Sequence, residues 1–172
     1  MAHSLHASPK SFFVIAHNIR SLLNVGSIFR SSDAFGVTRL YLTGYTGRPD
    51  NLIHKAKITK TALGAEEFVK WEYKKSAVRV IKDLRVTYPK INIIGLENNL
   101  PVGAGFSRPQ PLPKFKPTFP LALILGEEVK GISQQLIEFC DKLVEIPMNG
   151  QKESLNVSVA FGVAAYVLSS QR

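Results

Sequence analysis

The sequence predicts an α/β fold in which a mostly parallel sheet is flanked by helices. Short apolar runs such as Phe12–Ala16 and Leu121–Leu125 alternate along the chain with longer segments of helical period. Both runs are apolar throughout, which is typical of strands covered on both faces. The chain has 172 residues, 45% hydrophobic and 20% charged, which suits one well-buried domain. Since no repeat or linker is visible, we expect a single domain over 1–172 with a core from about 12 to 168.

The first third of the chain predicts a β-α-β unit. Phe12–Ala16 is the first strand. Asn24 suits the N-cap and Gly36 the C′ position of the helix that follows. Thr38–Thr43 is rich in β-formers and alternates, so it is expected as the second strand. The polar loop before the helix should therefore lie at the carboxyl end of the first strand.

The alternation continues to the end of the chain. A short helix precedes a turn at Thr61–Ala65, and Phe68–Tyr73 is expected as a strand with Phe68 and Trp71 in the core. Residues 98–120 hold six of the ten prolines and show no period, which predicts an irregular surface loop. Further helices are expected at Lys75–Val86, Ser133–Phe139 and Leu155–Ser169, and further strands at Ile91–Leu96, Leu121–Leu125 and Leu143–Ile146.

The charge balance indicates an anionic partner. Lysine and arginine exceed aspartate and glutamate by 22 − 13 = +9, and the pI is about 9.8. No basic amphipathic anchor is evident, so nucleic acid is favoured over a membrane surface. Basic charge for solubility alone is the alternative.

Several classes of protein are excluded by what the sequence lacks. Cys140 is the only cysteine, which excludes a disulfide framework and a thiolate metal cluster. Phe12–Ala16 is too short for a signal-peptide core, and Val157–Leu168 is too short to cross a membrane. We therefore expect a soluble cytoplasmic protein without a membrane or metal partner.

Polar residues gather in three loops at the carboxyl ends of predicted strands, where open α/β sheets bind ligands. The first loop and its helix carry Asn24 and Arg30, the second carries Glu128, and the third carries Ser154 and Asn156. Each has a purely structural alternative: helix capping for the asparagines and the serine, a solvated charge for Arg30, and a surface turn for Glu128. Their combination is what favours a site.

The same three stretches resemble the motifs of the SpoU, or TrmH, family of RNA ribose 2′-O-methyltransferases, and the resemblance covers about Phe12 to Leu168. Glu127 is a departure, since the family often has Asn or Ser there. A separate RNA-binding domain, found in many relatives, is not expected here, which leaves the RNA substrate open. The matching stretches are Asn24–Arg30 with Phe35–Gly36, Leu125–Ser133, and Ile146–Met148 with Glu153–Ala160.

The resemblance implies a C-terminal deep trefoil knot, a rare exception to unknotted topology, and a site for S-adenosyl-L-methionine (AdoMet) held mainly by backbone groups. It also implies a homodimer formed through the knot region and the last helix. That helix is apolar on most sides, which independently favours cover by another chain or by the protein's own core. By position, the cofactor-binding residues would be Leu96, Gly126, Ile146, Met148, Ser154 and Leu155.

The resemblance also assigns a reaction, methyl transfer to a ribose 2′-hydroxyl, with tRNA expected before rRNA as substrate. Arg30 matches the key residue of the family, which is proposed there to act as a general base. Because a guanidinium stays protonated, we expect it instead to bind the target phosphate and the developing alkoxide. Asn24, Glu128, Ser154 and Asn156 would organise the site.

Two other functions compete with this one: a non-catalytic RNA-binding protein on the same scaffold, and base methylation by another knotted family. Several basic residues are plausible phosphate contacts in each case. They are Arg20, Arg30, Arg39, Lys55, Lys57 and Lys60.

Overall fold

A computed structural model describes residues 10–98, 100 and 108–172, and in this part of the chain seven strands form one sheet. Every strand pair is parallel, in the order β3-β2-β1-β6-β4-β7-β5. The predicted α/β class with a mostly parallel sheet is therefore confirmed. The strands are β1 Phe12–His17, β2 Arg39–Thr43, β3 Trp71–Lys74, β4 Asn92–Leu96, β5 Gln110–Pro111, β6 Leu121–Leu125 and β7 Lys142–Glu145.

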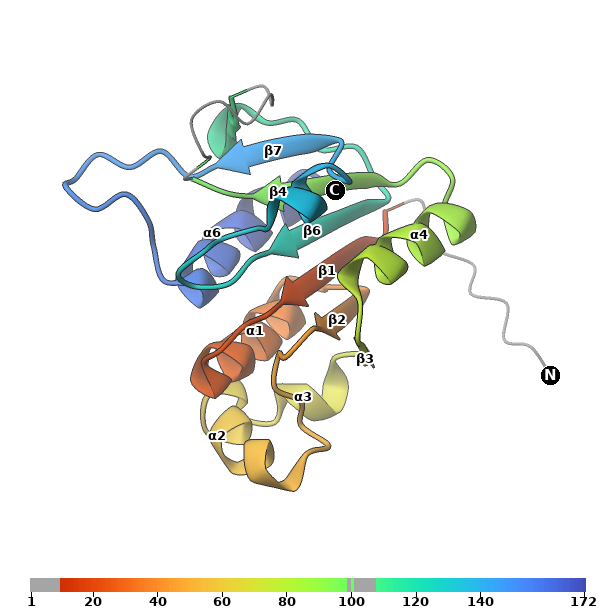
Figure 1. The fold of residues 1–172 in the computed structure, drawn as a ribbon, viewed down its shortest axis with the longest axis vertical. Helices are drawn as coiled ribbons and strands as arrows, with labels where there is room; N and C mark the ends of the chain where they lie inside the picture. Colours follow the sequence, from red (N-terminus) through yellow and green to blue (C-terminus); the bar gives the residue numbers. More distant parts are fainter. Residues whose placement is uncertain (1–9, 99, 101–107) are drawn as a thin grey trace.

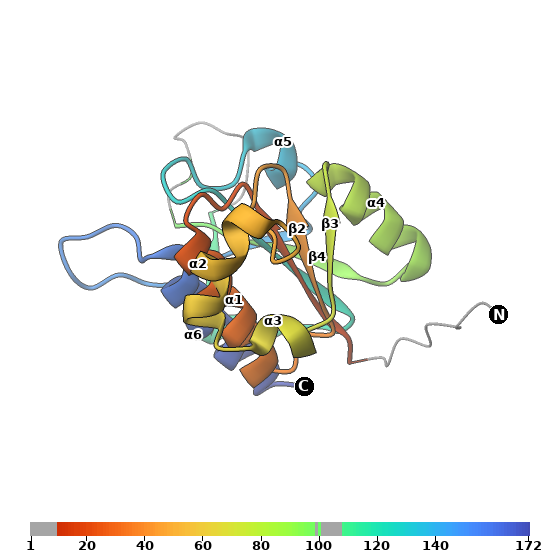
Figure 2. The same ribbon diagram turned by 90° about the horizontal axis from the view of Figure 1, so that it is seen from below.

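Helices cover both faces of the sheet (Figures 1 and 2). Helices α1 and α6 lie side by side on one face, with α2 and α3 packed beyond α1, whereas α4 and α5 lie on the other face. No helix among these residues is long and apolar enough to cross a bilayer. The helices are α1 Leu22–Ala34, α2 Leu52–Ala62, α3 Ala65–Phe68, α4 Ala77–Thr87, α5 Gln134–Ile137, α6 Val157–Ser169 and the 3₁₀ turn η1 Leu112–Lys114.

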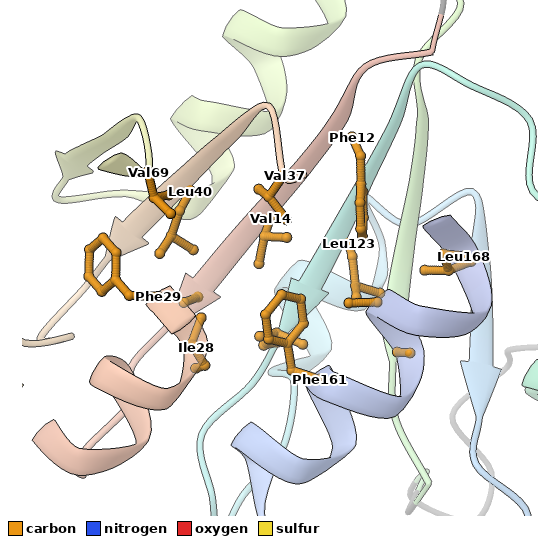
Figure 3. Close-up of a cluster of buried hydrophobic side chains, with 14 of the residues drawn as sticks. Phe12, Val14, Ile28, Phe29, Val37, Leu40, Val69, Leu123, Phe161 and Leu168 are labelled. Atoms are coloured by element: carbon orange, nitrogen blue, oxygen red, sulfur yellow. The ribbon is translucent and has the colours of Figure 1, made fainter. Parts of the chain in front are cut away.

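The central strands are buried on both sides because alternate side chains enter two cores. Phe12 and Val14 point toward α1 and α6, whereas Phe13 and Ile15 belong to the cluster under α4 and α5. Figure 3 shows the first cluster, in which Phe161 of α6 lies between β1, β6 and the side chains of α1. This double cover explains the unbroken apolar runs in the sequence.

Helix α1 begins three residues earlier than predicted. Its N-cap is Ser21, whose hydroxyl accepts a hydrogen bond from the Asn24 N–H at 3.3 Å. Asn24 was expected to cap the helix, but it lies in the first turn and its side chain is free for other contacts. Gly36 does follow the helix at φ +61°, as predicted for a C′ glycine.

The third strand begins later than the sequence suggested. Phe68 ends α3 and is 75% exposed, so the prediction that it belongs to the core is wrong. Trp71 is partly buried and meets Phe29 edge-on at 6.1 Å, as expected of a core residue. Thr61 still belongs to α2, and the turn is confined to Leu63 and Gly64, both left-handed.

The remaining differences lie near the end of the chain. The prediction that 98–120 is an irregular surface loop is wrong for its second half, because that half forms β5 and η1 and buries Leu112; residues 99 and 101–107 lie outside the described residues. Helix α5 ends at Ile137, two residues before the predicted Phe139. Helix α6 begins at Val157, not Leu155, so Leu155 belongs to the loop before it.

Candidate active site

A cavity of about 210 Å³ opens at the carboxyl ends of β4, β6 and β7. Five of the six residues predicted to hold a cofactor line it: Leu96, Gly126, Ile146, Ser154 and Leu155. Met148 does not line it. Met148 belongs to the segment between β7 and α6, which projects away from the body of the molecule in both ribbon views (Figures 1 and 2).

The rim formed by residues 126–131 depends on a close backbone approach. A Cβ added to Gly126 would lie 2.3 Å from the carbonyl carbon of Gly131, so only glycine fits there. Glu127 and Gly131 exchange two backbone hydrogen bonds, at 3.1 and 2.9 Å, which close the turn. The turn holds Glu127 and Glu128 on the cavity wall.

Two further residues of the cavity, Glu97 and Asn98, were not predicted. Asn98 binds the backbone of Ile146 twice: its Nδ2 donates to the carbonyl at 2.7 Å, and its Oδ1 accepts from the N–H at 3.1 Å. The Glu97 carboxylate accepts a hydrogen bond from the N–H of Ile132 at 2.8 Å. Both residues directly follow β4, so their position at a strand's carboxyl end was the available signal.

Glu128 anchors the start of α1 to the cavity rim. Its carboxylate accepts hydrogen bonds from the N–H groups of Arg20 and Ser21, both at 3.0 Å, and from Asn24 Nδ2 at 3.1 Å. Partial burial would by itself raise the pKa of Glu128, but these hydrogen bonds outweigh it, and the pKa lies below its ordinary value of 4.5. The carboxylate is therefore ionised at neutral pH.

Asn24 connects all three predicted motifs. While its amide donates to Glu128, its Oδ1 accepts from Asn156 Nδ2 at 3.1 Å and from the Ser158 hydroxyl at 3.5 Å. Asn156 also caps α6, because its Oδ1 accepts from the Ser158 N–H at 2.9 Å. Side chains more than 100 residues apart in the chain thus form one polar network at the cavity edge.

Arg30 and Ser154 stand outside this network. Arg30 is exposed on α1, six residues after Asn24 and therefore about 9 Å further along the helix axis. Its guanidinium makes no hydrogen bond or ion pair with the rest of the described chain. Ser154 lines the cavity but makes no side-chain hydrogen bond with residues 10–98, 100 or 108–172.

Beside the network lies a second polar group, which we call the rim cluster: Arg20, Tyr45 and Glu127. Arg20 Nη1 lies 3.7 Å from Glu127 Oε1. Desolvation, followed by the charge of the nearby Glu127 carboxylate, raises the pKa of the Tyr45 hydroxyl. Tyr45 was not singled out by the sequence. Among the described residues, no group of three or more His, Cys, Asp or Glu side chains could hold a metal ion.

Comparison with known proteins decides the family. The model of the SpoU rRNA Methylase family matches residues 11–166, nearly all of the chain. The chain belongs to this family.

Two relatives carry names that specify a reaction. The tRNA (guanosine(18)-2′-O)-methyltransferase of Aquifex aeolicus is 30% identical over 169 residues, which cover 98% of this chain and 73% of the relative. The 23S rRNA (guanosine-2′-O-)-methyltransferase RlmB of Escherichia coli K12 is 34% identical over 161 residues, 94% of this chain but only 60% of RlmB. This SpoU-family chain therefore spans about three fifths of the rRNA enzyme.

The fold is shared with solved structures. The SpoU methyltransferase AviRb of Streptomyces viridochromogenes, in complex with the cofactor AdoMet, superposes with a TM-score of 0.81 at 24% identity, covering 96% of this chain and 59% of AviRb. This likeness confirms the arrangement of sheet and helices.

Proposed function

We propose that this SpoU-family chain is an AdoMet-dependent RNA methyltransferase that acts on a ribose 2′-hydroxyl. The observation that carries the proposal is the cavity at the carboxyl ends of β4, β6 and β7 together with the Asn24 network at its edge. The names of the Aquifex and Escherichia relatives support the reaction, and they support both tRNA and rRNA as the substrate. Of these two substrates, we propose tRNA.

The residues of the cavity suit AdoMet, which is cationic at its sulfonium and amino groups. Leu96, Ile146 and Leu155 offer apolar faces for an adenine ring. The wall carries three carboxylates, of Glu97, Glu127 and Glu128, against one ammonium group, of Lys130, and this excess of negative charge favours a cation. Bound AdoMet would supply an electrophilic methyl group.

The chain's own task is to position the ribose and to stabilise charge as the hydroxyl loses its proton. Arg30 remains a cation and would donate hydrogen bonds to the target phosphate and to the developing alkoxide, so the proton passes to phosphate or water. Asn24 and Asn156 would hold the ribose, while Glu128 fixes Asn24 in place. Ser154 would complete the wall between cofactor and ribose.

We also propose that the protein is a homodimer. Helix α6 has an exposed apolar face formed by Val159, Val163 and Tyr166, whose exposed fractions are 52%, 40% and 63%, respectively. This face continues to the C-terminal end of α1, where the C-cap residue Phe35 meets Tyr166 edge-on, with ring centroids 6.2 Å apart. Because α1 also carries Arg30, cover of this face by a second copy would bring that arginine to the subunit interface.

The trefoil knot belongs to the same proposal. It is supported by the family and by the sheet order, in which β4 lies between the two later strands β6 and β7. A crystal structure that traces the whole chain with AdoMet bound would test both the trefoil knot and the homodimer.

The decisive experiment supplies labelled AdoMet and RNA from a strain lacking the gene. Transfer to a 2′-oxygen makes the neighbouring phosphodiester resistant to alkali, because the attacking hydroxyl is blocked. We expect alkali-resistant labelled dinucleotides from RNA and no transfer to DNA of matching sequence. RNA binding without transfer would instead support the non-catalytic alternative.

The role of Arg30 has a matched control. Arg30→Ala should lower kcat at least a hundredfold while the AdoMet Kd stays within threefold. Arg79 is an exposed arginine on α4, on the opposite face of the sheet, and Arg79→Ala should stay within twofold of the parent. Near-normal methylation by the Arg30 variant would reject the role.

A further inference from the structure

Helix α2 presents a stripe of cationic and apolar side chains to solvent. Its residues Leu52–Ala62 include three lysines and no acidic residue. Three of its exposed side chains follow one another at intervals of four and three residues, so they lie on one face of the helix. We call them the α2 stripe: Ile53, Lys57 and Lys60. Ile53 is 84% exposed although it is aliphatic, and exposed apolar surface of this kind marks a site of interaction.

The two lysines of the α2 stripe are not neutralised within the part of the chain that the structure describes. Lys57 and Lys60 make no ion pair or side-chain hydrogen bond there. The helices that pack on α2 carry three acidic residues, Asp33 of α1 and Glu66 and Glu67 of α3. Glu66 is buried, and none of the three forms an ion pair with either lysine. Both ammonium groups are therefore open to an anionic partner.

Helix α2 is held tightly against α1. A Cβ added to Gly26 of α1 would lie 2.2 Å from the carbonyl oxygen of Ile58, so the two helices approach with no room for a side chain between them. The Thr61 hydroxyl donates a hydrogen bond to the carbonyl of Leu23 at 2.8 Å. Thr61 follows Lys57 by four residues, so Lys57 lies one turn away on the side of α2 that borders α1. The α2 stripe thus has a fixed position relative to α1.

This position places the α2 stripe beside the candidate active site. Leu23, which receives the hydrogen bond from α2, directly precedes Asn24. Arg30 follows Gly26 by four residues and Leu23 by seven, so it lies on the same side of α1 and continues the cationic surface. Helix α1 lies between α6 and α2 (Figure 1), so cover of the α6 face by a second copy would leave the stripe open.

The chemistry of the stripe suits a nucleic acid strand. A lysine ammonium is a compact cation with three donors, which suits single phosphate oxygens. The Cβ atoms of Lys57 and Lys60 are about 5–6 Å apart, so both side chains can reach phosphates of one strand. Ile53 adds an apolar surface for a sugar or an unstacked base. An acidic protein segment would also match the charge, but the continuation toward Arg30 and Asn24 favours RNA, because the proposed function puts the ribose and its phosphate there.

We infer that the α2 stripe is the docking surface for the RNA strand that flanks the target nucleotide. Lys57 and Lys60 bind its phosphates, and Ile53 packs against an adjacent sugar or base. The inference rests on the proposed function, and it assigns RNA docking to a helix that contributes no residue to the cavity lining.

The binding test measures the Kd for radiolabelled total tRNA from a strain lacking the gene, by filter binding between about 50 and 300 mM NaCl. Lys57→Gln/Lys60→Gln should raise the Kd about tenfold to a hundredfold at the lowest salt. It should also reduce the slope of log Kd against log salt by about 1.5, since each phosphate contact contributes about 0.7–0.9. The matched control removes the same charge with Lys82→Gln/Lys90→Gln. Lys82 is exposed on α4, on the other face of the sheet, and Lys90 precedes β4 at the edge opposite the cavity, so the Kd should stay within threefold.

The activity test separates docking from chemistry. Lys57→Gln/Lys60→Gln should raise the KM for RNA, while kcat at saturating RNA stays within twofold and the AdoMet Kd does not change. Ile53→Ser should raise the KM about threefold to tenfold with an unchanged salt slope, because no phosphate contact is lost. Val86→Ser is its control, since Val86 is an aliphatic residue of α4 with a similar exposure of 82%, and its KM should stay within twofold.

Equal losses of tRNA affinity in the two double variants would overturn the inference, because net charge alone would then explain binding. Stripe variants that keep the parental Kd for tRNA but dissociate the protein in sedimentation would also overturn it, because the stripe would then be a contact between protein chains. If the parent binds tRNA through the stripe but transfers no methyl group to a 2′-oxygen, the proposed function fails and the docking surface stands.

Discussion

Removal of the Glu128 carboxylate should destabilise the fold as well as the site. The carboxylate accepts three hydrogen bonds, at 3.0, 3.0 and 3.1 Å, and joins the 126–131 turn to the start of α1. A hydrogen bond to a charged group is worth about 1.5–3 kcal/mol when sheltered. Here the donors are partly exposed and regain water in the variant, so we expect Glu128→Ala to cost about 2 kcal/mol in total at pH 7.

The pH dependence of this cost follows from the lowered pKa of Glu128. A group whose folded pKa lies below its unfolded value stabilises the fold fully above the unfolded pKa, here about 4.5, and loses that contribution as pH falls through the folded pKa. The difference in stability between parent and Glu128→Ala should therefore be constant from pH 7 to about 5 and shrink below about 4.5.

Urea unfolding at pH 7 and at pH 3.5 measures both quantities from the midpoint, provided that the m-value does not change. Glu138→Ala is the control, because Glu138 is an exposed carboxylate on the opposite face of the sheet and should change stability by less than about 0.5 kcal/mol. If Glu128→Ala costs no more than the control at pH 7, or costs as much at pH 3.5 as at pH 7, the hydrogen-bonding account of Glu128 is wrong.

Three other changes have expected outcomes. Phe161→Ala removes a fully buried ring and should lower the free energy of unfolding by about 3–5 kcal/mol, whereas Phe68→Ala, at a residue 75% exposed, should cost less than about 0.5 kcal/mol; equal costs in urea unfolding would contradict the core assignment. Gly126→Ala places a Cβ 2.3 Å from backbone atoms of Gly131, so calorimetry should show at least a tenfold loss of AdoMet affinity, and retained affinity would show that the turn is not needed. Burial, and then the adjacent Asp141 charge, raise the pKa of Cys140 to about 12, so a thiol reagent at pH 8 should label the folded protein far more slowly than the denatured one; equal rates would refute the burial of the thiol.

The sequence determined the elements whose signal is local. Two strands were predicted from unbroken apolar runs, Leu121–Leu125 and Phe12–Ala16. A strand that is buried on both faces carries apolar side chains at every position, so the run itself indicates the strand. Gly36 was placed correctly because a left-handed C′ residue excludes most side chains. Of the six residues that the family resemblance assigned to the cofactor, five line one cavity, because the strands of a parallel sheet end at a common edge; that they bind the cofactor stays a prediction.

Only the tertiary structure decided how the polar residues meet. Asn24 was expected as a helix cap, yet Ser21 takes that role, and the freed Asn24 side chain joins Glu128 to Asn156 across more than 100 residues of sequence. Asn98 was missed because its partner is the backbone of Ile146, which no side-chain pattern reveals. Phe68 was misplaced for the converse reason: the position of α3, not the residue's own hydrophobicity, sets its exposure. Local pattern fixes which segments become strands and helices, whereas contacts between distant segments depend on the register in which the sheet brings them together.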